Sequence, residues 1–160
     1  MIGHLLRHEI EELLHTQMIG RLACHDKDYL YVVPISYAYE DDYIYCHSYE
    51  GRKLQIMRRN PGVCFQVDEL HDMANWKSVI AWGEYEELLD EDERNKALQI
   101  LLRRPVPITS SITTHLGQTW PFTAKDEEEL SDIPGIVFRI ALAKKSGKYE
   151  KTSETPAIMY

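Results

Sequence analysis

Six segments of this chain carry the side-chain pattern of β-strands, and they constrain the fold more than any other feature of the sequence. In residues 29–39, for example, Tyr31, Val33 and Ile35 fall on one face of an extended chain. Successive side chains of a strand point to opposite faces, so this alternation indicates a strand with one packed face. The six segments are residues 20–24, 29–39, 43–48, 62–67, 77–89 and 134–143.

Short connections join most of these segments, such as the turn at residues 40–42. Because short connections favour antiparallel neighbours, the order predicts an antiparallel sheet that closes or nearly closes on itself. Pro34 cannot donate to a sheet ladder, so it marks an edge, a bulge or a break in pairing. We expect residues 68–75 to form a polar loop between two strands.

Three segments have the apolar spacing of helices that flank the sheet. They cover residues 5–15, residues 52–60 before Pro61, and a segment that begins at Asp90 and stops before Pro105. Asp90 can cap this helix, and Glu93 can reach back to it as in a capping box. The fold class is therefore α+β, mainly β with flanking helices.

We expect one domain over residues 1–143 and a polar, mobile C-terminal tail over residues 144–160. Residues 105–133 show no clear period, and a connection of this length is expected to cover something or to hold a short helix. No linker divides the chain, and we find no internal repeat.

Composition and charge argue against several classes of partner and location. The net charge of −8, from 26 acidic and 18 basic residues, disfavours nucleic acid and acidic membrane surfaces as partners. There is no apolar run near the length that a membrane span needs, and the N-terminus does not resemble a secretory signal. Three widely spaced cysteines predict reduced thiols in a cytoplasmic protein.

One stretch combines the features of a phosphate site. A strand at residues 43–48 is followed by a turn at Glu50-Gly51 and then by a helix that opens with Arg52-Lys53. Free backbone N–H groups, the positive end of the helix dipole and two cations would converge there. The alternative is a surface turn with two solvated cations, and these residues alone leave both interpretations open.

Histidine spacing gives no metal site. His4 and His8 stand four residues apart without the carboxylate that a metal-binding motif of this kind requires, so we expect them to face solvent. His71 has no partner at metal-ligand spacing. No Ser-His-Asp or Cys-His nucleophile pattern is present either.

Four motifs, taken in this order, resemble the flavin-binding split-barrel family that includes pyridoxamine 5′-phosphate oxidase, and especially its smaller, nitroimidazole-resistance-type flavoproteins. The motifs are YVVPIS at 31–36, YCHSYEGRKL at 45–54, NPGVCF at 60–65 and WKSVIAWG at 76–83. The resemblance covers roughly residues 10–103. It implies an antiparallel six-stranded split β-barrel that forms a homodimer, with FMN in the cleft between the subunits.

The resemblance also assigns roles to individual residues. It implies that Arg52 and Lys53 hold the FMN phosphate and that Ser78 faces the cofactor from the partner subunit. The flavin ring and ribityl chain would lie along two strands. The residues implied on these strands are Pro34, Ile35, Ser36, Cys46 and His47. His47 is also the candidate proton donor, and its alternative role is to orient the cofactor by a hydrogen bond.

The resemblance indicates an FMN-dependent oxidoreductase that reduces small electron-poor organics, nitro compounds or quinones, with electrons from NAD(P)H. Pyridoxamine phosphate oxidases carry an arginine-rich C-terminal motif that residues 144–151 lack, so we expect no such activity here. Two alternatives stay open. One is a non-catalytic flavin-binding or sensing module, and the other is a haem-handling protein that uses the histidine-bearing segment 68–72.

Overall fold

The computed structural model describes residues 1–104 and 130–152. The expectations for residues 105–129 and 153–160 therefore lie outside the described residues. The strands are β1 (Ile2–His4), β2 (Ile19–Asp26), β3 (Tyr29–Ser36), β4 (Ala38–Glu40), β5 (Tyr43–Ser48), β6 (Gly62–Asp72), β7 (Asn75–Glu87) and β8 (Ile136–Glu150). The helices are α1 (Arg7–Thr16), α2 (Arg52–Arg59) and α3 (Glu91–Arg103).

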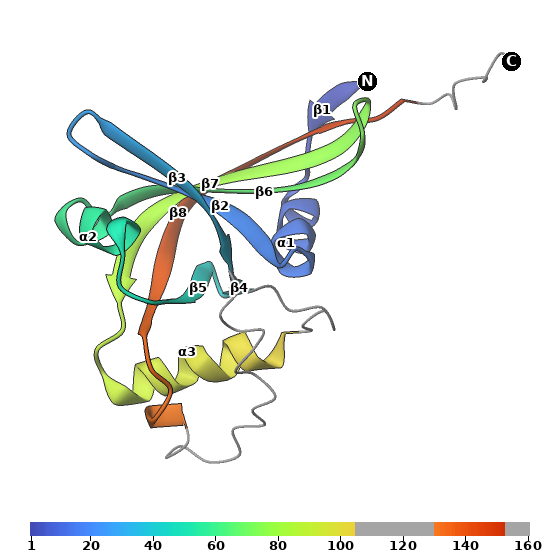
Figure 1. Cartoon of the computed structure of the whole chain (residues 1–160). Helices are drawn as coiled ribbons and strands as arrows, with labels where there is room; N and C mark the ends of the chain where they lie inside the picture. The colour runs from blue at the N-terminus through green and yellow to red at the C-terminus, as the bar shows by residue number, and fades with distance from the viewer. Residues whose placement is uncertain (105–129, 153–160) are drawn as a thin grey trace, which may run out of the picture.

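All strand pairs are antiparallel, which confirms a mainly antiparallel α+β fold. The sheet runs in the order β3-β2-β6-β7-β8-β5-β4, and β1 pairs with β8. In Figure 1, β6, β7 and β8 run together as a long twisted ribbon, with α3 below the sheet. Among the described residues β3 pairs only with β2, so Pro34 lies on an edge strand, one of its three expected positions.

The six-stranded barrel is not confirmed, because the sheet has eight strands and is not closed among the described residues. The segment expected at residues 29–39 divides at Tyr37, whose N–H donates to the carbonyl of Met18 at 3.1 Å. β1 was not predicted, since three residues are too few to show a period. It pairs with residues 148–150 of β8.

Two strands run further than their side-chain pattern indicates. β8 continues through Glu150, so residues 144–150 belong to the sheet and not to a mobile tail. β6 continues to Asp72, so residues 68–72 are strand and not loop. Here polar residues pair through the backbone with β7, which requires no apolar face.

The core has two clusters. The first packs apolar residues of α1 and α2 against the sheet, including Leu14, Met57 and Phe65. The second places Leu98 and Leu101 of α3 against a smaller set of residues. Its other buried members are Ala38, Tyr45, Leu88, Ala97, Leu130 and Val137.

α3 begins and α2 ends where the sequence predicts. The Asp90 side chain accepts a hydrogen bond from the Glu93 N–H at 3.1 Å, which confirms Asp90 as the cap of α3. α2 ends at Arg59, before Pro61 as expected. None of the helices in the described part of the chain is long and apolar enough to cross a bilayer.

Candidate phosphate and cofactor site

The start of α2 is suited to bind an anion. Gly51 precedes the helix in an extended conformation, no side chain caps the first turn, and that turn contains no acidic residue. The first N–H groups of a helix have no partner within the helix, so they remain available to an anion. The local sequence Gly51-Arg52-Lys53 adds two cations at the same end.

The four cations of α2 divide into two pairs. Arg58 binds the carboxylates of Glu50 and Glu87, and Arg59 binds that of Asp26. Within the described residues, neither Arg52 nor Lys53 has a carboxylate within ion-pair distance. The charge of α2 that remains uncompensated therefore lies at its N-terminus, where the dipole also favours an anion.

Lys53 is half-buried and close to two thiols. Burial lowers the pKa of its ammonium group, and the neighbouring Cys46 and Cys24 partly oppose that shift. A cation that is removed from water without a carboxylate partner is destabilised. A bound phosphate would supply the missing negative charge.

Arg52 lies beside the first residue of β3, a contact that the sequence motifs do not indicate. Its Nη1 donates to the Tyr29 hydroxyl at 2.9 Å, and its guanidinium lies 5.5 Å from the centre of that ring. Tyr29 therefore joins the candidate site. The expected lining residues Pro34, Ile35 and Ser36 follow five to seven positions later, roughly 17–23 Å along the strand. A ligand that reaches both places must be elongated.

Cys46 and His47 are neighbours on β5 and face opposite sides of it, as successive strand residues do. Cys46 is 1% exposed, and burial raises the pKa of its thiol to about 12. His47 Nε2 lies 2.6 Å from the Pro134 carbonyl oxygen, and its ring meets Tyr49 edge-on. These contacts tie His47 to the chain before β8, and both of its expected roles, as a proton donor and in orienting the cofactor, stay predictions.

Ser78 lies elsewhere on the sheet, near the start of β7, where its hydroxyl accepts a hydrogen bond from the Gln66 side chain at 3.1 Å. It shares a face of β7 with Ile80 and Trp82, which are both exposed. The role of Ser78 toward a cofactor stays a prediction.

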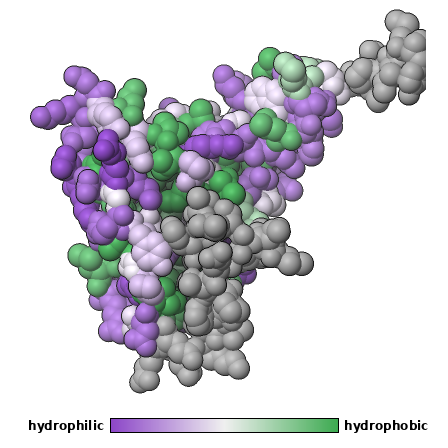
Figure 2. Space-filling view, in the orientation of Figure 1, coloured by the Kyte–Doolittle hydropathy of each residue, from purple (hydrophilic) through white to green (hydrophobic). Residues whose placement is uncertain are grey.

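Part of that outer face of the sheet is apolar. Leu30 and Val32 of β3 are 79% and 62% exposed, and Trp82 is 39% exposed. The register aligns Val32, Ala23, Cys64 and Trp82 across four strands. A cavity of about 520 Å³ lies over this region. Figure 2 shows hydrophobic side chains at the surface where β2 and β3 cross β7.

A second cavity, of about 280 Å³, begins directly after Ser36 and is lined by Tyr37, His15 and Arg104. Arg104 Nη1 donates to the Tyr37 carbonyl at 2.6 Å, and its buried Nε has no hydrogen-bond partner among the described residues. Burial lowers the pKa of this guanidinium. No sequence motif indicates Arg104, because its position depends on the packing of α3.

The described residues contain no group of three or more histidine, cysteine or acidic side chains that could hold a metal ion. His4 on β1 and His8 on α1 are both exposed, as expected. His71 is exposed on β6, 3.6 Å from Glu69.

Comparison with known proteins places these features in context. The model of the pyridoxamine 5′-phosphate oxidase family matches residues 7–148. A FAD-binding protein from Mesorhizobium loti has a TM-score of 0.71 at 32% identity, over 94% of this chain and 99% of that chain. A curated, uncharacterised protein from Rhizobium meliloti is 37% identical over 103 residues, which is 62% of this chain and 68% of that protein.

The fold also matches that of a putative 5-nitroimidazole antibiotic resistance protein from Bacteroides thetaiotaomicron. Its TM-score is 0.69 at 21% identity, over 93% of this chain and 87% of that chain. At this level of identity the likeness concerns the fold alone.

Proposed function

Since the chain belongs to the pyridoxamine 5′-phosphate oxidase family, we propose that it is a flavoprotein oxidoreductase that holds FMN by its phosphate at Arg52 and Lys53. The observation that carries this proposal is the pair of cations at the uncapped start of α2, which no carboxylate of the described residues neutralises. A phosphate fits this donor set, because it can accept from the guanidinium, the ammonium and the backbone N–H groups together.

The other residues have separate tasks in this proposal. Arg52 is held over β3 by Tyr29, which directs an extended ligand along that strand toward Ser36. Cys46 keeps its proton and closes the inner side of the site without adding charge. His47 orients the chain at residues 134–135 through its hydrogen bond to Pro134. When bound, the flavin supplies the electron-transfer chemistry that these side chains lack.

FAD is the second candidate cofactor. It is favoured by the relative from Mesorhizobium loti, which is named an FAD-binding protein and spans nearly the same length. Both molecules carry a phosphate next to the ribityl chain, so Arg52 and Lys53 serve either one. Mass determination of the flavin released from purified protein distinguishes them.

We place the electron acceptor in the cavity beside Arg104. This guanidinium has no carboxylate partner among the described residues, and its cavity adjoins the end of β3 that would lie against the flavin ring. A nitro compound or a quinone gains negative charge on its oxygens during reduction, which a desolvated guanidinium stabilises. Small electron-poor organics are therefore the proposed substrates, with NADH or NADPH as the electron source.

Anaerobic reduction tests the proposed activity. Bound flavin should bleach on addition of NADH or NADPH and recover its absorbance when a nitro compound or a quinone is added. Flavin that is bound but reduced by neither nucleotide would favour a non-catalytic binding or sensing module. A Soret band in place of flavin bands would indicate a haem-handling protein instead.

We expect a homodimer that buries the outer face of the sheet and brings Ser78 of one copy to the phosphate site of the other. Val32→Asp, which puts a charge into this face, should convert the dimer to monomers and weaken FMN binding. Leu89→Asp is the matched control, because Leu89 is exposed outside this face. Analytical ultracentrifugation that finds a wild-type monomer with stoichiometric FMN would refute the shared site.

The pH dependence of FMN binding should report on Lys53. Burial lowers the pKa of Lys53, so its charge is lost as the pH rises through a value below that of an ordinary lysine. FMN binding should therefore weaken from neutral to alkaline pH, whereas the Lys53→Arg variant should keep its affinity over that range. Fluorescence titrations of both proteins across this range provide the comparison.

We also propose a cytoplasmic location. All three cysteines are free thiols, as a reducing compartment requires.

A further inference from the structure

We propose that Arg58 is a positioning residue of the phosphate site: it engages the Glu50 carboxylate and thereby keeps Arg52 and Lys53 available to the phosphate. This inference rests on the proposed function. Glu50 stands in the turn before α2, two residues from Arg52. A free carboxylate there would compete with the phosphate for both cations.

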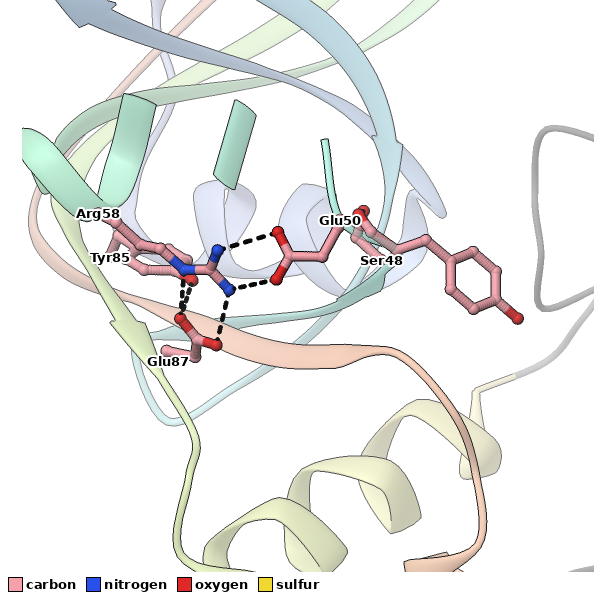
Figure 3. A network of polar contacts seen from close by, with 6 residues as sticks. Ser48, Glu50, Arg58, Tyr85 and Glu87 are labelled. Atoms are coloured by element: carbon pink, nitrogen blue, oxygen red, sulfur yellow. Dashed lines mark hydrogen bonds and ion pairs between the residues drawn. The ribbon is translucent and has the colours of Figure 1, made fainter. Parts of the chain in front are cut away.

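The geometry of Arg58 suits this task (Figure 3). Its Nη1 and Nη2 donate to the two oxygens of Glu50 at 2.9 and 2.8 Å. Its Nε and Nη2 donate to the two oxygens of Glu87 at 2.8 and 2.9 Å. A guanidinium is planar and presents its donors in a fixed fork, so two bidentate contacts hold both carboxylates in defined orientations.

The sheet anchors this network and thereby holds the turn at Glu50-Gly51 in place. Glu87 is the last residue of β7, and it also accepts a hydrogen bond from the Tyr85 hydroxyl at 2.9 Å. The Tyr85 N–H donates to the Pro61 carbonyl at 2.8 Å, just after α2. Arg58 thus links the strand end, the helix and the turn that precedes Arg52.

Both carboxylates are ionised in this arrangement. The hydrogen bonds from Arg58 lower the pKa of Glu50 and of Glu87. The negative charge of Glu50 therefore lies beside the phosphate site at neutral pH. Without Arg58, the negative charge of Glu50 would repel the phosphate and would attract Arg52 and Lys53, the two cations that bind it.

Arg59 provides a matched control. It belongs to the same turn of α2, is exposed, and forms an ion pair with Asp26 at 2.9 Å. Arg59→Gln removes the same formal charge as Arg58→Gln but leaves Glu50 engaged. Because Arg59→Gln releases Asp26 instead, any difference between the two variants reflects which carboxylate is released and not net charge.

Titration of the full-length variants with FMN and with riboflavin, followed by flavin fluorescence, tests the proposal. Arg58→Gln should bind FMN roughly 5- to 10-fold more weakly, the effect expected of one uncompensated charge near a partly exposed site. Arg59→Gln should match wild type, and riboflavin, which lacks the phosphate, should bind all variants alike. The double variant Arg58→Gln, Glu50→Gln should regain the affinity of wild type, because the competing carboxylate is gone.

Two outcomes overturn the inference while the proposed function stands. One is a loss of FMN affinity in Arg58→Gln that Glu50→Gln does not restore, since Arg58 would then act only as a structural link. The other is a weaker affinity in Glu50→Gln alone, a variant that keeps Arg58 and its contact with Glu87. A wild-type protein that binds no FMN would overturn the proposed function and this inference together.

Discussion

Replacing Arg52 and Lys53 together with alanine is expected to weaken FMN binding by roughly 100-fold or more. Each side chain would give the phosphate charge-assisted hydrogen bonds worth about 1.5–3 kcal/mol, and about 1.4 kcal/mol corresponds to a tenfold change in affinity. The two losses will not add fully, because the side chains share one ligand. Isothermal titration of FMN into wild-type and variant proteins measures the difference.

Riboflavin is the control ligand for this experiment. It lacks the phosphate, so its weaker binding should be nearly indifferent to the double substitution. Arg52→Lys should also reduce FMN affinity, because an ammonium group cannot reproduce the planar contact of a guanidinium. Equal FMN affinity in wild type and the double variant would remove the start of α2 from the site and favour two solvated cations.

Replacing Leu88 with alanine should destabilise the fold by about 2–5 kcal/mol, the usual cost of removing a buried leucine side chain. Leu88 is 4% exposed and packs in the cluster that holds α3, together with Leu98 and Val137. The cavity left behind would loosen α3 from the sheet. Urea unfolding followed by circular dichroism gives the change in the free energy of unfolding.

The next residue is the control for this prediction. Leu89 is 83% exposed, so Leu89→Ala should change stability by no more than about 0.5 kcal/mol. Equal losses in the two variants would contradict the assignment of Leu88 to a packed cluster.

The sequence predicts those parts of the fold in which side chains alternate between core and solvent. The segments at residues 29–39 and 43–48 carry this signal, and strands form in both. The signal is missing at β1, which is only three residues long, and at the largely polar residues 144–150, although both segments pair with a neighbouring strand through the backbone. Side-chain periodicity reports burial, and strand pairing can continue where burial stops.

Some residues of the candidate site could be predicted from the sequence, and others could not. Gly51, Arg52 and Lys53 are adjacent in the chain, so a local motif was enough to select them. Tyr29 reaches Arg52 from 23 residues away, and Glu87 reaches Arg58 from 29 residues away. No short motif contains such contacts.

The opposite orientation of the Cys46 and His47 side chains could be predicted from the sequence. Cys46 and His47 are consecutive residues of a strand, so their side chains had to point to opposite faces. Alternation alone therefore indicates that the two side chains cannot line the same surface of a ligand. The structure adds that Cys46 faces the core and that His47 contacts the Pro134 carbonyl.

Identification of the cofactor tests the central claim most directly. The wild-type protein and the Arg52→Ala, Lys53→Ala variant would be purified without added flavin, and the denatured supernatants analysed by absorbance and mass spectrometry. We predict that wild type releases FMN in near-equimolar amount and that the variant releases little. A wild-type protein without flavin, or a variant that retains as much FMN as wild type, would contradict a flavin held by its phosphate at the start of α2.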